Sequence, residues 1–219
     1  NDVILYLLNA IYFKANWTTK FDVKETESKN FTLSNGEKKI LPLMSSFRAF
    51  RYYSNYSSYN NINILPENRF QGAELTYGKE GKVSLFLFLP DQGSSMEKFY
   101  LQLTEENLEK WVKGFYNTEG YISFPKFKTK WEKELKGNLD TLGMKSAFSD
   151  SANFTNMGSS SLGSIYISSV LQSTFVDVNE EGTEAAAVTV VVGSATSSAP
   201  TARFVADRPF FYMIRDNET

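Results

Sequence analysis

The 219-residue sequence predicts an α+β fold with many strands and few helices. Several short stretches, such as residues 175–180, alternate apolar and polar side chains with the period of two that is typical of strands. Helix signals are confined to residues 94–115 and 132–142. Thr104 precedes an acidic first turn in the former, and Gly143 ends the latter. With 42% hydrophobic and 22% charged residues, the chain has the composition of one globular domain or part of one.

Strand patterns follow one another through the first half of the chain. Residues 2–13 form a near-continuous apolar run, which is typical of a buried central strand. Residues 34–37 contain Asn-Gly, which favours a tight hairpin turn. Further strands are expected at residues 39–44, 47–53, 73–77 and 83–90. The last of these is apolar on both faces, so we expect it to be covered on both sides.

The second half continues with a strand over residues 121–131. Lys126, Lys128 and Lys130 alternate there and would share one face. Such a stripe suits either a groove for a heparin-type polyanion or an ordinary solvated strand face. The acidic residues nearby and the low net charge favour the solvated face. The final strand begins near Phe210, and its hairpin partner is missing from the sequence.

Residues 183–201 are the least ordinary stretch. Residues 183–192 contain no Pro, no Gly and one charge, Glu184. As a strand they would place Thr183, Ala185 and Ala187 on one small, uncharged face, which fits between two existing strands without a clash or a buried charge. A hairpin arm, or an Ala-rich helical turn followed by an edge strand, remains an equal alternative. Residues 193–201 are all Gly, Ser, Thr, Ala or Pro, a composition typical of an exposed loop.

Several motifs in the correct order resemble the inhibitory serpins. Residues 180–187, Glu-Glu-Gly-Thr-Glu-Ala-Ala-Ala, resemble the hinge of the serpin reactive-centre loop, and residues 204–210 resemble the signature that follows it. Further matches lie at residues 9–17, 124–128, 142–148 and 154–157. The resemblance implies a serpin fold, which is multi-sheet and mostly antiparallel, with peripheral helices and an exposed reactive-centre loop at about residues 180–203. It also implies one partial domain over residues 1–219, incomplete at both ends, in which the strands at residues 3–13 and around Phe175 lack neighbours.

The resemblance implies an irreversible, suicide-type inhibitor of serine proteases rather than an enzyme. The partner would be a target protease, held as a covalent acyl complex while the cleaved loop inserts as a strand into the central sheet of a metastable fold. The hinge would comprise Glu181, Gly182, Thr183, Glu184, Ala185, Ala186 and Ala187. Family spacing from Gly182 places the reactive bond at Thr196–Ser197, with Ser194, Ala195 and Ser198 beside it in the protease pocket.

These small side chains, and the absence of Lys and Arg from residues 185–202, favour an elastase-like or subtilisin-like target over a trypsin-like one. The alternative is a non-inhibitory binding or carrier protein on the same fold. Members of that kind tend to carry bulky, charged or Pro residues in the hinge, which this chain does not.

Composition excludes other functions. The chain has no Cys and no His, so it cannot form a disulfide, a thiolate metal site or a Ser-His-Asp arrangement. We expect no metal and no cofactor. The net charge of −2 and the lack of a long apolar run give no reason to expect a nucleic-acid or membrane partner. We expect a monomer when the protein is complete. Sequons at Asn16, Asn30, Asn55, Asn153 and Asn217, although such motifs also arise by chance, lead us to expect an extracellular, secreted protein.

Gln172 departs from the family pattern, because a His usually occupies this place. Gln can still form a hydrogen bond between strands, but it does not titrate near neutral pH. We therefore expect any pH dependence that the His gives other members to be missing here.

Overall fold

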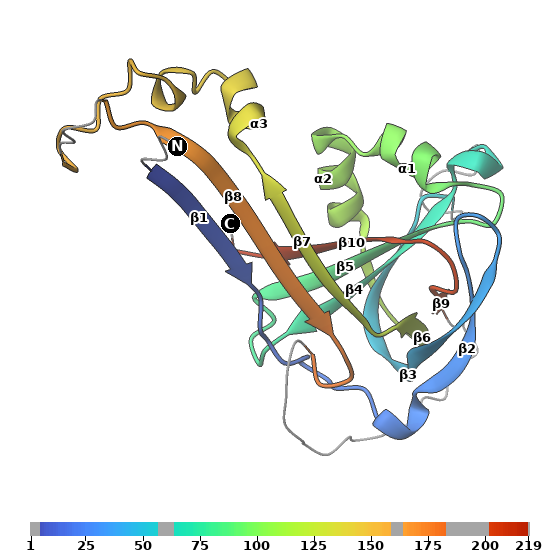
Figure 1. Ribbon diagram of the computed structural model, residues 1–219. Coiled ribbons are helices and arrows are strands. Elements are labelled where there is room, and N and C mark those ends of the chain that lie inside the picture. Colours follow the sequence, from blue (N-terminus) through green and yellow to red (C-terminus); the bar gives the residue numbers. More distant parts are fainter. Residues whose placement is uncertain (1–4, 57–63, 159–163, 183–201, 219) are drawn as a thin grey trace. The chain divides into compact units, whose positions relative to one another are not determined.

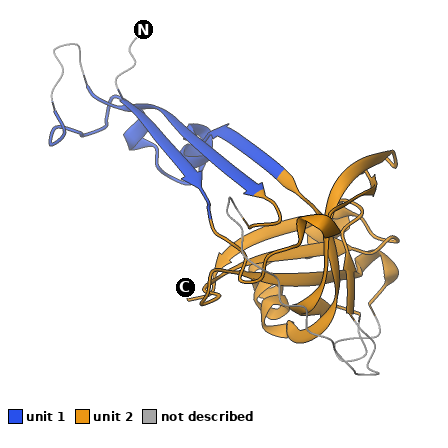
Figure 2. Cartoon of the chain, turned by 90° about the horizontal axis from the view of Figure 1, so that it is seen from below, with its two compact units in different colours: residues 1–14, 128–177 blue, residues 15–127, 178–219 orange. Residues whose placement is uncertain are grey.

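The computed structural model describes residues 5–56, 64–158, 164–182 and 202–218 (Figure 1). The chain forms two compact units (Figure 2). Unit 1 contains residues 1–14 and 128–177, and unit 2 contains residues 15–127 and 178–219. Among the described residues, no helix has both the length and the apolar character needed to cross a membrane.

Unit 1 is organised around a three-stranded sheet with the order β1-β8-β7 (Figure 1). Its strands are β1 (Leu5–Tyr12), β7 (Phe127–Glu134) and β8 (Ile167–Val178). β1 and β8 run parallel, and a short helix, α3 (Lys136–Thr141), follows β7. Helix α3 ends before Gly143, whose φ of 104° lies in the region that glycine favours, as the sequence predicted.

Two expectations about these strands are wrong. β1 is a strand, but within the described residues it is not buried: Leu8 is 75% exposed and Ile11 52% exposed, and residues on both faces of the strand are exposed. Conversely, the strand that contains Phe175 does not lack neighbours, since β8 lies between β1 and β7.

We predict that residues 1–219, expressed alone, associate into aggregates and do not inhibit a protease. The reason is that one edge of β1 has no strand partner among the described residues, so that it is a template for pairing with another chain, and that β1 carries exposed apolar side chains. Light scattering and thermal unfolding of the isolated chain measure this. A monomer that unfolds cooperatively and inhibits an elastase would contradict the prediction.

Unit 2 contains a larger sheet with the strand order β10-β5-β4-β3-β6-β9, and β2 pairs with β3 beside this path. All neighbours in it are antiparallel except β6 and β9, which are parallel. The strands are β2 (Glu27–Thr32), β3 (Lys38–Ser54), β4 (Phe70–Tyr77), β5 (Val83–Pro90), β6 (Tyr116–Pro125), β9 (Ala202–Val205) and β10 (Phe211–Asp216).

The structure joins and divides strands differently from the sequence prediction. One continuous strand, β3, replaces the two expected at residues 39–44 and 47–53. The pairing with β6 continues through Ser45 and Ser46, and the Ser45 hydroxyl lies 2.9 Å from that of Ser123. The predicted strand at 121–131 is in fact the end of β6 and most of β7, which separate at Lys126.

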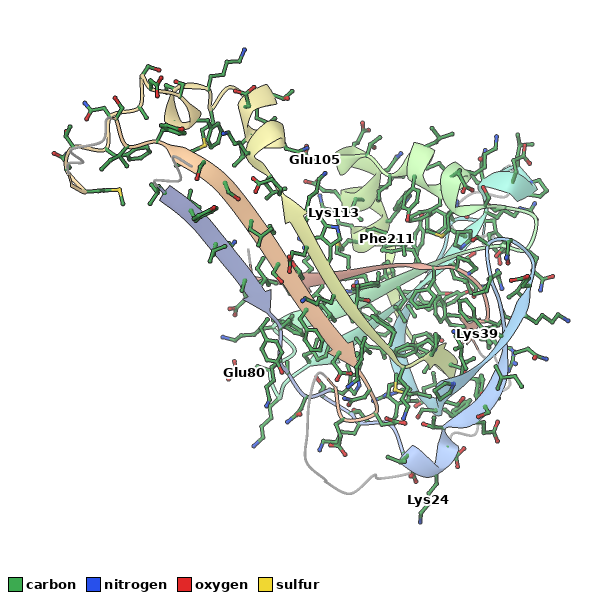
Figure 3. All side chains as sticks on the ribbon, viewed as in Figure 1. Lys24, Lys39, Glu80, Glu105, Lys113 and Phe211 are labelled. Atoms are coloured by element: carbon green, nitrogen blue, oxygen red, sulfur yellow. The ribbon has the colours of Figure 1, made fainter. Side chains whose placement is uncertain are left out.

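The predicted helical region contains two helices, α1 (Met96–Gln102) and α2 (Glu105–Gly114). The Thr104 side chain accepts a hydrogen bond from the Asn107 backbone, which confirms the predicted N-cap. β5 is buried on both faces, as expected. An aromatic core lies between the helices and the sheet, and Phe211, labelled in Figure 3, packs against it. Its buried members are Tyr53, Phe70, Phe86, Phe88, Phe99, Trp111 and Phe115. Short 3-10 helices lie at Val23–Glu25, Pro66–Asn68 and Ser146–Phe148.

Candidate functional site

The chain reverses direction in a tight turn directly after β8, over residues 179–182, which we call the hinge turn. The backbone N–H of Asn179 donates to Gly182 O at 2.9 Å, and the Gly182 N–H donates to Asn179 O at 3.2 Å. The Asn179 side chain also accepts from the Glu181 N–H at 3.0 Å. The expected strand end at residues 180–182 is therefore confirmed.

The segment around Trp17 holds the hinge turn in place. The Trp17 backbone N–H donates to Glu181 O at 3.0 Å, and the indole N–H donates to Asn179 O at 2.8 Å. The Phe21 N–H donates to Glu180 O at 2.9 Å. Trp17 is 3% exposed and stacks on Tyr77 with ring centroids 4.2 Å apart, so the turn contacts a rigid part of unit 2.

Gly182 is required by this packing. Its φ of 129° is one that other residues rarely adopt, and a Cβ atom there would lie 2.6 Å from Asn16 Cα and from Trp17 N. Any larger residue would separate the hinge turn from the Trp17 segment.

Two lysines of unit 2 neutralise the acidic residues of the hinge turn. Glu180 is 5% exposed, and its carboxylate lies 3.1 Å from Lys126 Nζ and accepts from the Thr26 hydroxyl at 2.8 Å. Glu181 pairs with Lys20. Burial alone would raise the pKa of Glu180, but the hydrogen bonds and the Lys126 charge outweigh it and lower the pKa below its ordinary value.

The lysine stripe that could have formed a polyanion groove is largely neutralised. Lys126 contacts Glu180, Lys128 lies 2.8 Å from Asp177, and Lys130 lies 3.7 Å from Glu132. Of the two interpretations of these lysines, the structure therefore agrees with a solvated, ion-paired strand face.

β1 and β8 pair directly along a seam that runs from Leu5–Ile167 to Tyr12–Phe175. No strand lies between them among the described residues. Asn9 and Gln172 are partners in register, and the Asn9 amide donates to the Gln172 side-chain oxygen at 2.8 Å. This confirms that Gln172 forms a hydrogen bond between strands.

The chain re-enters the described structure at Ala202, the first residue of β9, which pairs with β6. The stretch between the hinge turn and β9 lies outside the described residues. It contains the predicted hinge residues Thr183, Glu184, Ala185, Ala186 and Ala187 and the predicted reactive-bond residues Ser194, Ala195, Thr196, Ser197 and Ser198. Their roles stay predictions.

The sequence reasoning singled out the hinge residues but missed their partners. Lys20, Thr26 and Lys126 contact the hinge turn from segments far away in the sequence. No spacing pattern could have connected them, because the contacts depend on how the sheet brings distant segments together. Across the described ranges, no group of acidic side chains has the geometry of a metal site.

The described fold contains a parallel pair of strands, β1 and β8, a tight turn directly after β8, and the strand β9, which begins at Ala202. The model of the family described as Serpin (serine protease inhibitor) matches residues 1–219. The chain therefore belongs to the serpin family, and the recognition and fold class predicted from the motifs are confirmed.

Known proteins support this assignment. The human leukocyte elastase inhibitor is 34% identical, and the match covers 98% of this chain and 55% of that protein. Intracellular coagulation inhibitor 2 of Tachypleus tridentatus is also 34% identical, with 98% and 50% covered. The crystal structure of tengpin, a thermophilic serpin in the native state, has a TM-score of 0.74 and 31% identity over 97% of this chain and 52% of that chain.

The chain spans about half the length of the curated relatives it matches. The expectation of a secreted, extracellular protein is wrong. The relatives include intracellular serpins, as the name of intracellular coagulation inhibitor 2 states. The sequons that suggested secretion are weak signals in an Asn- and Ser-rich chain. Asn55, for example, is 7% exposed, and its side chain contacts backbone groups of Asn68 and Phe70.

Proposed function

We propose that the complete protein is a suicide-type inhibitor of serine proteases, in which the cleaved loop inserts as a new strand between β1 and β8. The observation that carries this proposal is the β1–β8 seam, two parallel strands paired directly, with the hinge turn at the end of β8 leading into the loop. Tengpin, a structural relative, was solved in a state described as native, which is consistent with an uninserted sheet here.

The mechanism is a race between two steps. The protease serine attacks the carbonyl carbon of Thr196, the bond to the Ser197 nitrogen breaks, and an acyl-enzyme forms. Water then either releases the protease by hydrolysis, or residues 183–192 insert first and carry the protease away as a covalent complex. Insertion must break the side-chain bond between Asn9 and Gln172 and the backbone ladder of the seam. It gains ladders on both sides of the new strand.

The small face of Thr183, Ala185 and Ala187 suits this insertion, because no bulky or charged group has to enter the sheet. The same sequence argues against the carrier alternative. We propose that the complete protein acts as a monomer, that it needs no cofactor, and that its only macromolecular partner in this reaction is the protease.

The proposed target is an elastase-like or subtilisin-like protease. Arg203, the first basic residue after the loop, lies in β9 and pairs in register with Tyr121 of β6, so its bond is part of a strand and not of the loop. The resemblance to the leukocyte elastase inhibitor agrees with a protease whose pocket accepts small side chains.

The test is to mix the complete protein with pancreatic elastase and, separately, with subtilisin. We expect a complex that survives denaturing gel electrophoresis and a released peptide whose mass begins at Ser197. Cleavage without any complex would favour the carrier alternative. Complex formation with a cut after Arg203 would contradict the assigned bond.

A further inference from the structure

A cavity of about 250 Å³ lies within unit 2, beside the Trp17 segment that holds the hinge turn. Three neighbouring strands of the larger sheet, β3, β4 and β6, contribute to its walls (Figure 1). The lining combines apolar side chains, Trp17, Phe50 and Leu75, with polar and charged ones. Such a mixture is typical of sites that bind small molecules. We call this space the Arg48 cavity, after an arginine of β3 that lines it.

The charge of Arg48 is not balanced by its neighbours. The Nε and Nη1 atoms of its guanidinium are buried and have no hydrogen-bond partner. The remaining nitrogen, Nη2, donates to Thr19 O, and the group lies 4.6 Å from the centroid of the Phe21 ring. Neither neighbour carries a negative charge. Two buried nitrogen atoms without a partner and a positive charge without a counter-ion are costly in a protein interior.

Arg48 remains charged at neutral pH despite its burial. Burial lowers the pKa of the guanidinium to about 10, which is still well above neutrality. The unbalanced charge is therefore present under physiological conditions and has to be met either by water or by an anion.

The acidic residue in the lining cannot supply the missing charge, because it has other partners. Glu74 is 4% exposed, lies 2.5 Å from Arg51 Nη1, and accepts from the Ser84 hydroxyl at 2.8 Å. The lining thus contains two arginines and one glutamate, with a net charge of +1. One monovalent anion in the cavity would neutralise it.

We propose that the Arg48 cavity is a binding site for a small organic monocarboxylate. The carboxylate pairs with the Arg48 guanidinium, and pairs of this kind form strong, charge-assisted hydrogen bonds. The body of the ligand contacts the apolar part of the lining at Trp17, Phe50 and Leu75. Sites for drug-sized ligands span about 300–1,000 Å³, so a cavity of about 250 Å³ suits a smaller molecule. This proposal goes beyond the inhibitory function and does not depend on it.

The test is thermal unfolding of the complete protein in sodium benzoate, which has one carboxylate and a small apolar body. Sodium chloride at the same ionic strength is the reference, and benzamide is the uncharged analogue. A ligand that binds the folded state alone stabilises it in a saturating manner. We expect benzoate to raise the unfolding midpoint by about 2 °C at ten times its Kd, and benzamide to cause no shift.

Three variants locate the site. Arg48→Met removes the guanidinium but keeps an unbranched side chain, so it should abolish the benzoate shift. Arg48→Lys keeps the charge without the planar fork, and we expect its Kd for benzoate to be weaker by about threefold or more. The matched control is Arg203→Met, the same substitution at an exposed arginine of β9, which should leave the benzoate shift unchanged.

Three results would overturn the proposal: no saturating shift with benzoate in a wild type that unfolds cooperatively, an equal shift with benzamide, or a shift that persists in Arg48→Met. If Arg48→Met does not fold, Arg48→Lys decides the question, and an unchanged Kd would contradict the role of the guanidinium. A larger shift with inorganic phosphate than with benzoate would overturn the assignment to an organic carboxylate.

Discussion

The substitution Thr183→Arg is expected to turn the complete protein from an inhibitor into a substrate. Under the proposed mechanism, Thr183 would be the first inward-facing residue to enter the β1–β8 seam. An arginine there would place an unpaired guanidinium between packed strands, at an effective cost of several kcal/mol. Each 1.4 kcal/mol added to the insertion barrier slows insertion about tenfold, whereas deacylation is unaffected. Relative to insertion, hydrolysis of the acyl-enzyme should therefore be favoured about a hundredfold or more over the wild type.

The matched control is Glu184→Arg, because the side chain of Glu184 would point outward if residues 183–192 inserted as a strand. Titration of an elastase with each variant, followed by denaturing gels, measures how much of the inhibitor forms the covalent complex and how much is released as cleaved inhibitor. Thr183→Arg should yield cleaved inhibitor and active protease, and Glu184→Arg should still form the complex. A complex at near one-to-one stoichiometry with Thr183→Arg, or equal damage from both variants, would show that insertion does not begin at this residue.

The substitution Glu180→Gln is expected to destabilise the complete protein by about 1–3 kcal/mol at neutral pH. Glu180 is 5% exposed and binds both Lys126 and Thr26, so the amide keeps the shape but loses two charge-assisted hydrogen bonds. We expect a smaller loss of stability than for a fully buried ion pair, because the Lys126 side chain is 39% exposed and water screens the interaction. Urea unfolding of both proteins measures the difference.

The effect of Glu180→Gln should also depend on pH. Because the folded-state pKa of Glu180 is lowered, its carboxylate contributes stability above its unfolded pKa of about 4.3, and this contribution is lost as the pH falls through the folded pKa. The difference between wild type and variant should be full at pH 7 and disappear in acid. The control is Glu109→Gln, whose pair with Lys113 is exposed on both sides and should be worth less than about 0.5 kcal/mol. If the difference in the free energy of unfolding between wild type and Glu180→Gln were constant from pH 7 to pH 3, the Glu180 carboxylate would not have the stabilising role described here.

Local signals were sufficient to predict most of the strands that the structure describes. The Thr104 cap, the Asn-Gly turn and the strand end at Gly182 depend on neighbouring residues, and the structure confirms each. The family motifs then supplied the fold, because strand order is not encoded in any single stretch.

The sequence failed where long-range pairing decides the outcome. Two strands were expected at residues 39–44 and 47–53, yet the pairing of Ser45 with Ser123 and of Ser46 with Ile122 keeps β3 continuous. The apolar run of β1 predicted burial, which requires other elements packed on both faces of the strand, but its side chains are exposed on both faces within the described residues. The partners of Glu180 and Glu181 come from distant segments, so the acidic hinge could be predicted but the lysines that neutralise it could not.

The most direct test of loop insertion is the thermal stability of the complete protein before and after its loop is cut by a protease that it does not inhibit. Insertion of residues 183–192 into the β1–β8 seam would add backbone hydrogen bonds worth about 1 kcal/mol each. Each kcal/mol raises the midpoint of a domain of 150–250 residues by about 2–4 °C, and that of a longer protein by less. We therefore predict that cleavage near Thr196 raises the unfolding midpoint by about ten degrees or more. A cleaved protein that unfolds at the same temperature as the intact one would show that the seam does not open, and the inhibitory mechanism would be wrong.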